Sequence, residues 1–398
     1  MVQLHGRVVS LGIATVGLLW SAAVVARGAD AIARADNPVV ASKTTAKAKD
    51  IPKPKRQLSP ELSELRDRVR GLLAAHAQQP FNTRDNVPTE IMSRCLAFGC
   101  ATEVALESPE GQHINGITCL CWNYPCAGFE IIGQSDNHLA ARIGYGYQHR
   151  PGELLATLAF SRVPAEYPVR LSGRTVRKVA DLVEAEKLAC RRGGDLSSAL
   201  VGLSYYVNQS EWKNSLGETW SIERIVEEEL NQPAAASFDR TMNRLIGLSY
   251  ALAHQTKHNR PITGDFERAR KYVADFERFA LRRQNSDGSW GPNFPAARVA
   301  ADDSAAPLRM TSRMAEWLAL SLPQGRLEEP GMVGAINYLS TQLGSEHYQW
   351  NTPMLSTQEI ISIGHALHAL ATYDEREFRP TDEPGKPAAQ QPAATSVE

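Results

Sequence analysis

The chain has 398 residues, 43% hydrophobic and 22% charged, and its 43 Lys and Arg against 44 Asp and Glu give a net charge of −1. This balance excludes a protein that binds nucleic acid through bulk positive charge, and it excludes an acidic tail protein. Collagen-like and wholly disordered chains are excluded by the ordinary content of 28 Gly and 23 Pro. We therefore expect one large folded core or two medium ones.

Residues 1–29 have the parts of a secretory signal peptide. His5 and Arg7 form a short polar start, an apolar run extends from Val8 to Ala26, and a further small residue follows at Ala29. The apolar run is also about long enough to cross a bilayer, so an uncleaved N-terminal anchor is the alternative. The sequence therefore predicts an exported protein, periplasmic or secreted, with a membrane tether if the segment stays attached.

Two segments have too few apolar residues to bury. Residues 30–57 form a basic, proline-containing stretch, and residues 377–398 are rich in Pro, Ala and Gln. Such compositions predict a disordered linker and a disordered tail. The basic run 43–56 could touch an anionic membrane surface, although a solvated tether is the simpler interpretation. The folded domain is thus expected over residues 58–376.

Within residues 58–376, apolar residues recur at helical spacing, and no run shows the alternation of strands. Ser59 and Pro60 form a helix start, with Ser as the N-cap and Pro in the first turn. We expect an all-α domain of about a dozen helices. They are predicted at residues 61–77, 88–99, 138–147, 151–163, 176–192, 195–207, 221–230, 240–255, 265–284, 311–322, 330–343 and 356–374.

Two similar segments, Gly202–Val207 and Gly247–Leu252, lie 45 positions apart. This interval is the length of a helical hairpin, which favours a repeat of helix pairs, and the small residues would allow close helix approach. Chance similarity between two amphipathic helices is the alternative. Helix pairs can stack as an open solenoid or close into an α/α barrel, and periodicity alone does not choose between them.

One motif carries a family resemblance. Phe279, Gln284, Gly288 and Trp290 stand at the offsets of the QW repeat, so the segment resembles the squalene and oxidosqualene cyclases and the wider terpenoid cyclase/prenyltransferase-like α/α toroids. The usual upstream Lys-Gly pair is replaced by Asp275-Phe276. An Asp-Gly turn would let Trp290 fold back as an apolar lid, while the Gln284 amide satisfies backbone groups at helix ends.

The resemblance covers residues 195–373, and it reaches residues 57–192 by helix content alone. It implies a single α/α toroid of inner and outer helices around a central cavity. The acidic D-x-D-D motif of the cyclases is absent, since Asp302 and Asp303 form the nearest carboxylate pair and the motif's first Asp is missing. The zinc set of the prenyltransferases is also absent. We therefore expect a structural QW motif and no metal or cofactor, and the fold alone implies no cyclase activity.

Five of the six cysteines fall within about thirty residues. In an exported protein, disulfides are the simplest account of such a cluster. Free buried thiols, or a zinc site completed by His113 or His138, are the alternatives. We expect one bridge between Cys95 and Cys100 and another from Cys126 to either Cys119 or Cys121. Cys190 is then a distant partner or is left over.

Polar and aromatic residues are dense after the cysteine cluster. If residues 138–147 are helical, His138, Arg142 and Tyr145 share one face and could, with Asn123, bind a sugar acid and move protons. A polar face tied to nearby loops is the alternative. The neighbouring candidates for ligand binding are Trp122, Tyr124, Tyr147 and His149.

The remaining histidine pairs carry weaker signals. His254 and His258 stand four apart at a helix end, where a cation suits the helix dipole. His365 and His368 stand three apart in an Ala- and Leu-rich helix, and we expect at most one of them to face the core.

The function expected first is that of an exported toroid that binds an apolar or extended ligand, such as a lipid or isoprenoid, or a partner protein. A glycan-active lyase or hydrolase of α/α-toroid type is the alternative, and a diverged isoprenoid-processing enzyme is the second alternative. Whether the chain is an enzyme stays open, and nucleic acid is not an expected partner. An apolar, aromatic-lined cavity would favour a lipid, and an open polar groove would favour a glycan.

Overall fold

The computed structural model describes residues 58–79, 81–135, 138–171, 176–233, 237–292, 294, 304–348 and 355–379, all within one compact unit. The expected signal segment, the linker over residues 30–57, Asp302 and Asp303 lie outside these residues. Within the described ranges no helix is both long and apolar enough to span a bilayer.

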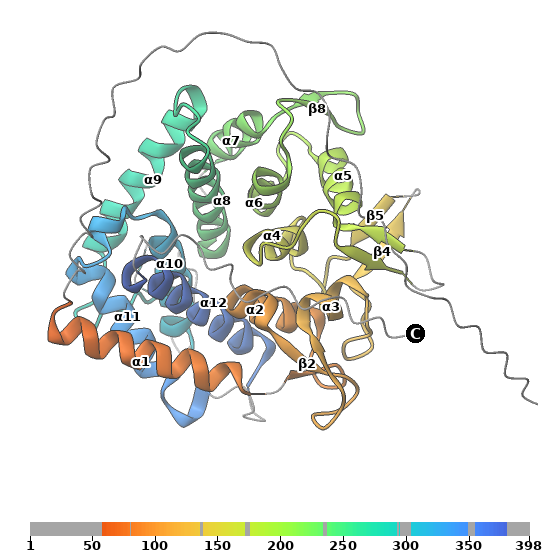
Figure 1. Cartoon of the computed structure of the whole chain (residues 1–398). Helices are drawn as coiled ribbons and strands as arrows, with labels where there is room; N and C mark the ends of the chain where they lie inside the picture. Colours follow the sequence, from red (N-terminus) through yellow and green to blue (C-terminus); the bar gives the residue numbers. More distant parts are fainter. Residues whose placement is uncertain are drawn as a thin grey trace, which may run out of the picture. The chain divides into compact units, whose positions relative to one another are not determined.

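The described part of the chain is mainly helical, as expected (Figure 1). Four serines mark helix starts, because their side chains accept a backbone N–H of the first turn: Ser59, Ser221, Ser237 and Ser356. The twelve α-helices of the described residues are α1 (Pro60–Ala77), α2 (Pro88–Phe98), α3 (Gly116–Cys121), α4 (Glu153–Phe160), α5 (Val179–Ala189), α6 (Ser197–Tyr206), α7 (Ile222–Asn231), α8 (Phe238–Lys257), α9 (Gly264–Arg282), α10 (Ala306–Ser321), α11 (Pro330–Leu343) and α12 (Thr357–Tyr373).

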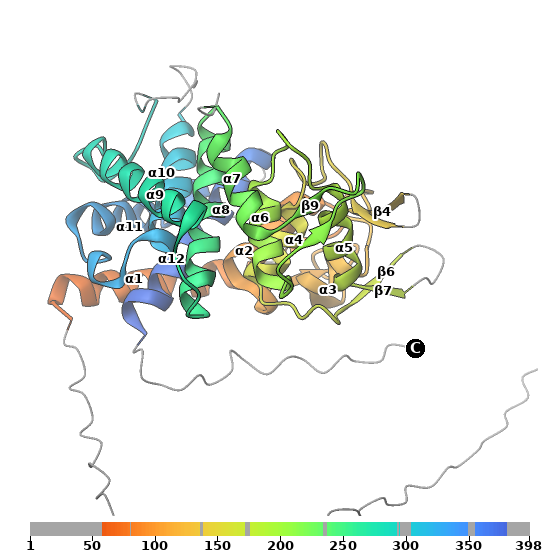
Figure 2. The same cartoon turned by 90° about the horizontal axis from the view of Figure 1, so that it is seen from above.

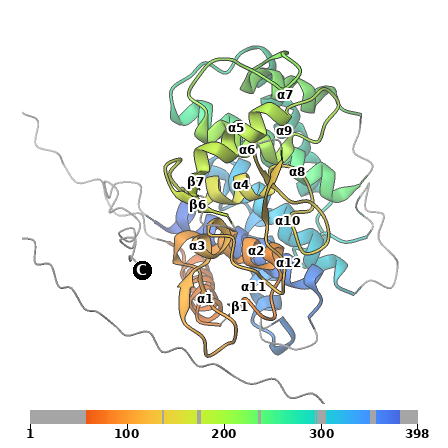
Figure 3. The ribbon, with the colours of Figure 1, turned by 90° about the vertical axis from the view of Figure 1, so that its right-hand side faces the viewer.

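Short strands form four small sheets, which the sequence pattern did not predict. The three-stranded sheet has the order β1 (Phe81–Asn82), β2 (Glu103–Ala105) and β3 (His113–Asn115). The three antiparallel pairs are β4 (Ile132–Ser135) with β5 (His138–Ala141), β6 (Pro168–Arg170) with β7 (Val176–Lys178), and β8 (Trp212–Lys213) with β9 (Thr219–Trp220). The β4–β5 and β6–β7 hairpins lie on the same side (Figure 2), and β6 contacts α3 while β7 contacts α5 (Figure 3).

The helix predicted over residues 138–147 is wrong. His138–Ala141 pairs with β4 instead, and Ile143 bridges to Gln148. Gly144 and Gly146 have φ of 134° and 79°, values that a helix cannot contain. The spacing of polar residues mimicked a helical face, but two glycines in three positions broke it. The short helix α3 was missed for the opposite reason, since its six residues are too few to show a period.

Six alternate helices contact one another in a sequence that closes on itself (Figure 1). Each of α2, α4, α6, α8 and α10 contacts the next even-numbered helix, and α12 returns to α2. The odd-numbered helices pack against this set: α3 contacts α2, α5 contacts α6, α7 and α9 contact α8, and α11 contacts α10 and α12. Helix α1 contacts α11 and α12.

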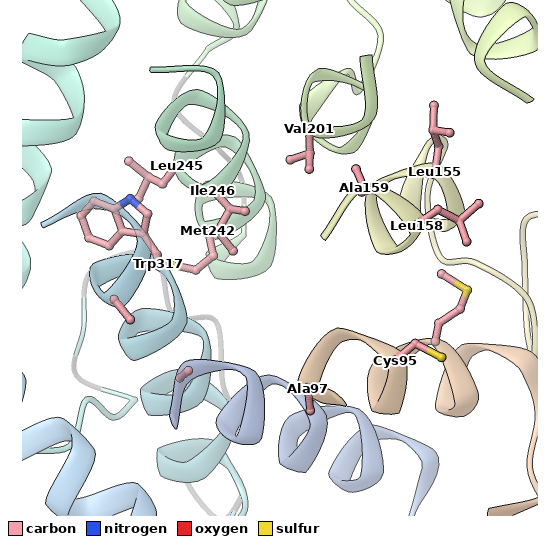
Figure 4. Packing of buried hydrophobic residues seen from close by; sticks show 14 of the residues in the cluster. Cys95, Ala97, Leu155, Leu158, Ala159, Val201, Met242, Leu245, Ile246 and Trp317 are labelled. Carbon is pink, nitrogen blue, oxygen red and sulfur yellow. The ribbon is translucent and has the colours of Figure 1, made fainter. Parts of the chain in front are cut away.

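The two similar segments lie in neighbouring helices of this set, α6 and α8. A Cβ added at Gly202 would meet Leu155 Cγ at 2.7 Å, and one added at Gly247 would meet the Ser197 carbonyl oxygen at 2.6 Å. Both glycines therefore stand where two helices approach too closely for a side chain. Around them the core is apolar and includes Val201, Met242 and Trp317 (Figure 4).

The folded domain extends slightly beyond residue 376, where the sequence predicted a disordered tail to begin. A π-helical turn, η4 (Asp374–Phe378), continues α12, and Glu377 is buried. The ring of Phe378 packs edge-on against Tyr373 at 5.3 Å. The apolar residue at 378 was obscured by the proline- and charge-rich sequence that follows it.

Candidate functional site: a polar cavity among six helices

The six even-numbered helices surround a cavity of about 220 Å³. Each helix contributes side chains from its first three turns at helical spacing, for example Asp239, Asn243 and Ile246 on α8. The chain just before α4 adds His149 and Arg150. The cavity is therefore lined by side chains from all six helices, and it reaches the last residue of α4, Phe160.

Most of the residues that line the cavity are polar or charged. Hydroxyl groups come from three threonine or serine positions on α2 and α4, two on α6 and one on α12: Thr89, Ser93, Thr157, Ser197, Ser198 and Ser362. Three arginines are balanced by three carboxylates: Arg150, Arg309 and Arg313 with Glu153, Asp239 and Glu316. Apolar contacts come from Met92, Leu96, Ala156, Phe160, Val201, Ile246 and Ile361. The wall is thus close to neutral overall, although it holds several charges.

A buried ionic cluster joins α8, α10 and α12 at this cavity. Arg313 and Glu316, one turn apart on α10, form an ion pair at 2.6 Å, with side chains only 9% and 5% exposed. Nδ1 of His365 lies 3.1 Å from the Glu316 carboxylate, and Nδ1 of His368 lies 2.8 Å from it. Arg313 also donates to Oδ1 of Asn243. One carboxylate therefore accepts from a guanidinium and two imidazoles.

Electrostatics define the protonation states in this cluster. Burial by itself would raise the pKa of the Glu316 carboxyl, but His365 and Arg313 outweigh it and hold that pKa well below its ordinary value. Burial, and then the Arg313 guanidinium, lower the pKa of His365 against the opposing effect of Glu316. At neutral pH the cluster thus holds an ionised Glu316 and a neutral His365. The neutral imidazole donates its Nδ1 proton to the carboxylate.

Arg313 also limits what this cluster can bind. Its Nη1 lies 3.0 Å from Nδ1 of His365 and 2.6 Å from the Glu316 carboxylate. A guanidinium so close to both groups opposes a metal cation between them. The described residues contain no group of three His, Cys, Asp or Glu side chains arranged to hold a metal ion.

A second polar group lies on the α2–α4 side of the cavity. The Glu153 carboxylate accepts from the backbone N–H of His149 at 2.6 Å and from Nε of Arg150 at 2.9 Å. Thr89 Oγ1 lies 3.4 Å from Nδ1 of His149. These contacts fix Glu153 at the first turn of α4, where a carboxylate also suits the helix dipole.

Of the site residues predicted from the sequence, only His149 lines this cavity. Asn123 is buried and clamps the neighbouring strand, because its amide accepts from Ile132 N–H at 2.7 Å and donates to the Ile132 carbonyl at 2.9 Å. His138 is exposed on β5, and Tyr145 is 80% exposed. The shared helix face proposed for His138, Arg142 and Tyr145 therefore does not exist.

The aromatic candidates make packing contacts away from the cavity. Trp122 lies under the guanidinium of Arg170 at 3.4 Å, and Tyr124 packs against the core. Tyr147 meets Phe129 edge-on at 5.2 Å and lies 5.9 Å from the guanidinium of Arg142. As candidates for ligand binding, these residues remain predictions without support from the cavity.

The QW segment makes the kind of contacts that its sequence suggested. Gln284 Nε2 donates to the carbonyls of Gly288 and Gly331 at 2.8 Å each. Trp290 is fully buried, and its Nε1 donates to the Ala280 carbonyl near the end of α9 at 2.9 Å. Phe279 packs edge-on against Phe276 at 5.6 Å. The segment therefore ties the α9 end to α11.

The six cysteines are present as free thiols, so neither expected disulfide is formed in the structure. Cys95 is buried in α2, whereas Cys100 is exposed and its Sγ donates to the Ser161 carbonyl at 3.4 Å. Cys190 is buried, and its Sγ donates to the Glu186 carbonyl at 3.4 Å. A Cys95–Cys100 bridge was expected, but the chain turns between the two residues and directs their thiols to different neighbours.

Arg313 and Glu316 of the buried cluster were not singled out from the sequence, and His365 and His368 were treated as a weak signal. His365 and His368 were expected to place at most one side chain toward the core, but both bind Glu316. The sequence did contain a signal. His365 and His368 stand three apart in one apolar helix, and Arg313 and Glu316 stand three apart in another. Two ionisable residues on the buried face of an apolar helix need partners on another helix.

In comparisons with known proteins, no family model, no curated protein and no solved structure matches the chain.

Proposed function

We propose that the chain is an α/α toroid whose central cavity binds a small, neutral, polyhydroxylated ligand of about one sugar unit. The fold part of the proposal is supported by the closed contacts of the even-numbered helices and by the odd-numbered helices packed against them. Inner and outer helices that alternate along the chain are what a toroid of helical hairpins requires.

The observation that carries the ligand class is the composition of the cavity wall. Six hydroxyl-bearing side chains, three arginines and three carboxylates line it. Hydroxyl groups of a ligand can donate to Glu153 or Asp239 and accept from serine, threonine or arginine side chains. A strongly charged ligand would face one unfavourable set of charges, whereas a neutral polyol can satisfy both sets.

One buried donor beside the cavity supports the same class. Arginine can only donate, so its contact fixes Oδ1 of Asn243 toward Arg313 and turns Nδ2 the other way. Within the described residues, Nδ2 of Asn243 has no hydrogen-bond partner. An acceptor oxygen of a ligand would offset the cost of that unpaired amide.

The size and lining of the cavity weigh against an extended apolar ligand. Its volume of about 220 Å³ is below the range of about 300–1,000 Å³ typical for sites that enclose drug-sized ligands. Among the described residues, Phe160 is the one phenylalanine, tyrosine or tryptophan that lines it. The lipid or isoprenoid ligand expected first from the sequence is therefore not the one we propose.

Ligand-observed NMR and thermal unfolding of the full chain test this proposal. The probes are D-glucose and D-galactose as neutral sugars, D-glucuronate as a charged sugar and farnesol as an isoprenoid. We expect saturation transfer to a neutral sugar and a rise in Tm with its concentration. Transfer to farnesol or glucuronate, with none to either neutral sugar, would overturn the proposed ligand class.

A matched pair of variants locates the binding. Ala156 lines the cavity on α4, and Ala156→Leu would fill part of it. Ala74 is exposed on α1, so Ala74→Leu serves as the control. We expect Ala156→Leu to weaken sugar binding at least tenfold and Ala74→Leu to leave it unchanged. Equal binding by both variants would place the sugar outside the cavity.

A glycan-active enzyme is the second candidate function, and the state of His365 favours it. A neutral imidazole held by an ionised carboxylate is a common arrangement for a proton acceptor. Incubation of the full chain with neutral oligosaccharides, followed by mass spectrometry of the products, tests this activity. Cleavage that is retained by Glu316→Gln would contradict a role for the cluster.

A further inference from the structure

The inference concerns two cysteines away from the cavity, and it is independent of the proposed ligand. The Sγ atoms of Cys119 and Cys126 lie 3.7 Å apart. Both residues are buried, at 0% and 1% exposure, and six residues separate them in the chain. Disulfide sulfurs lie about 2.05 Å apart, so the two thiols need to approach by about 1.7 Å.

The intervening turn already brings the ends of this segment together. The backbone N–H of Tyr124 donates to the Cys119 carbonyl at 3.1 Å, and Cys126 bridges to Phe129. Within this turn Asn123 has a φ of 57°, a region that non-glycine residues rarely occupy. A covalent bond across the turn would hold a backbone that is otherwise costly to maintain.

The structure also chooses between the two partners that the sequence left open for Cys126. Cys119 and Cys121 stand two apart on α3, so their side chains leave the helix in different directions. Cys119 is the one of the two whose Sγ contacts Cys126. Cys95 belongs to α2, and its Sγ faces the start of α3 beside Gly116.

We propose that Cys119 and Cys126 form a disulfide when the chain folds in an oxidising compartment. The oxidant is a disulfide, either of a thiol–disulfide oxidoreductase or of glutathione. One cysteine thiolate attacks the oxidant and forms a mixed disulfide, which releases the first oxidant thiol. The second cysteine thiolate then displaces the other oxidant thiol. The protein thus loses two protons and two electrons, and the oxidant's S–S bond becomes two thiols.

Burial determines when this step can occur. The hydrogen bond to Cys126 and then burial raise the pKa of the Cys119 thiol, so the folded chain offers little thiolate. A soluble oxidant also has no access to either sulfur. The disulfide therefore forms before the cluster is buried, and the folded reduced protein resists oxidation.

The test begins with the full chain unfolded and reduced, then refolded in a buffer of reduced and oxidised glutathione. Free thiols are alkylated under denaturing conditions, and the intact mass counts them. We expect four alkylated cysteines after oxidative refolding, and six when the refolding buffer contains only reductant. The same oxidised glutathione added to the already folded, reduced chain is expected to leave Cys119 and Cys126 free for alkylation, because both are buried.

Peptide mapping identifies the pair. Trypsin leaves five cysteines in one peptide, so chymotrypsin is needed, because cleavage after Leu120 and after Trp122 separates Cys119, Cys121 and Cys126. We expect a linked peptide pair that contains Cys119 and Cys126. A link from Cys126 to Cys121 or Cys95, or six alkylated thiols after oxidative refolding, would overturn the proposal.

Two serine variants form the matched control. Cys119→Ser is expected to abolish the link, and Cys121→Ser, on the same helix and equally buried, is expected to retain it. If Cys119→Ser fails to refold, the peptide map of Cys121→Ser still tests the proposal. A Cys119–Cys126 link in that map supports the proposal, and its absence contradicts it. Reduction of the linked protein should lower its Tm by several degrees.

Discussion

Glu316 on α10 and His368 on α12 are joined by a hydrogen bond of 2.8 Å, although 52 positions separate them in the chain. The same carboxylate accepts from Arg313 and His365. Removal of one member of a buried ion pair leaves the other charge uncompensated. Glu316→Gln should therefore lower the free energy of unfolding by about 3–5 kcal/mol, measured by urea denaturation at pH 7.

An exposed ion pair provides the control for this prediction. Arg162 and Glu375 pair at 3.0 Å with side chains 66% and 50% exposed. Glu375→Gln should change the free energy of unfolding by less than about 1 kcal/mol. If Glu316→Gln costs no more than this control, the buried cluster contributes no net stability.

Glu186 on α5 should give the protein a distinctive pH dependence. Burial raises the pKa of its carboxyl to about 7, against a backbone hydrogen bond from Gly152. Between the ordinary pKa of 4.5 and about 7, the native state holds a proton that the unfolded chain has released. The contribution of this group is therefore complete below the ordinary pKa, and it is lost as the pH rises through the folded pKa.

Glu186→Gln should remove this loss. Relative to the wild type, its free energy of unfolding should rise across that pH window by up to about 3 kcal/mol. Urea denaturation of both proteins at a series of pH values measures the difference. Glu184→Gln, at an exposed position of the same helix, should show no such rise. A difference for Glu186→Gln that is flat with pH would contradict the raised pKa.

Two glycine-to-alanine variants test how closely the even-numbered helices pack. Gly247→Ala meets the Ser197 carbonyl oxygen at 2.6 Å, a backbone atom that cannot rotate away. Gly202→Ala meets the Leu155 side chain at 2.7 Å, which can partly adjust. Overpacking of this kind costs about 1–3 kcal/mol, and we expect Gly247→Ala to cost more than Gly202→Ala in urea denaturation.

Gly71 is the control for the glycine variants, because a Cβ added there meets nothing within 4 Å. It lies inside α1, where alanine is favoured over glycine. Gly71→Ala should stabilise the protein by about 0.5–1 kcal/mol. If Gly247→Ala stabilised the protein as much as Gly71→Ala, the close approach of α8 to the Ser197 carbonyl of α6 would be contradicted.

Replacing the amide nitrogen of Gln284 by a hydrogen-bond acceptor should destabilise the protein. Its Nε2 donates to two carbonyls, so Gln284→Glu places carboxylate oxygens against the oxygens of Gly288 and Gly331. We expect a loss of about 3 kcal/mol in free energy of unfolding. Gln324 is exposed and its Nε2 donates to the Arg376 carbonyl at 3.1 Å, so Gln324→Glu should cost far less. Similar costs would mean that Gln284 does not link α9 to α11.

The sequence predicted most helices because their cause is local. Apolar spacing and serine caps are read within one segment, and Ser221, Ser237 and Ser356 each accept the bond expected of an N-cap. The strand pairs were missed because two to four residues show no period, and pairing depends on a second segment. At residues 138–147 the helix was predicted from the spacing of polar residues, although Gly144 and Gly146 already argued against a helix.

The cavity could not be predicted in the same way, since it depends on which helix faces of distant segments meet. His149 was identified by its aromatic and polar neighbours, although those neighbours lie elsewhere. Arg313 and His365 are 52 positions apart, and neither segment alone indicates that they touch. What the sequence did contain was an excess of ionisable side chains in two apolar helices, a pattern that requires partners without naming them.

The contact of α1 with α12 and η4 has a consequence for chain order. Arg70 on α1 binds Asp374 at 2.7 Å, so the first and last described helical elements are neighbours. A circular permutant that joins residue 379 to residue 58 through a flexible linker long enough to span them, and opens at the exposed Gly217 between β8 and β9, would break no helix contact. Such a chain should reach the same native state, because its closed contacts have no required starting point.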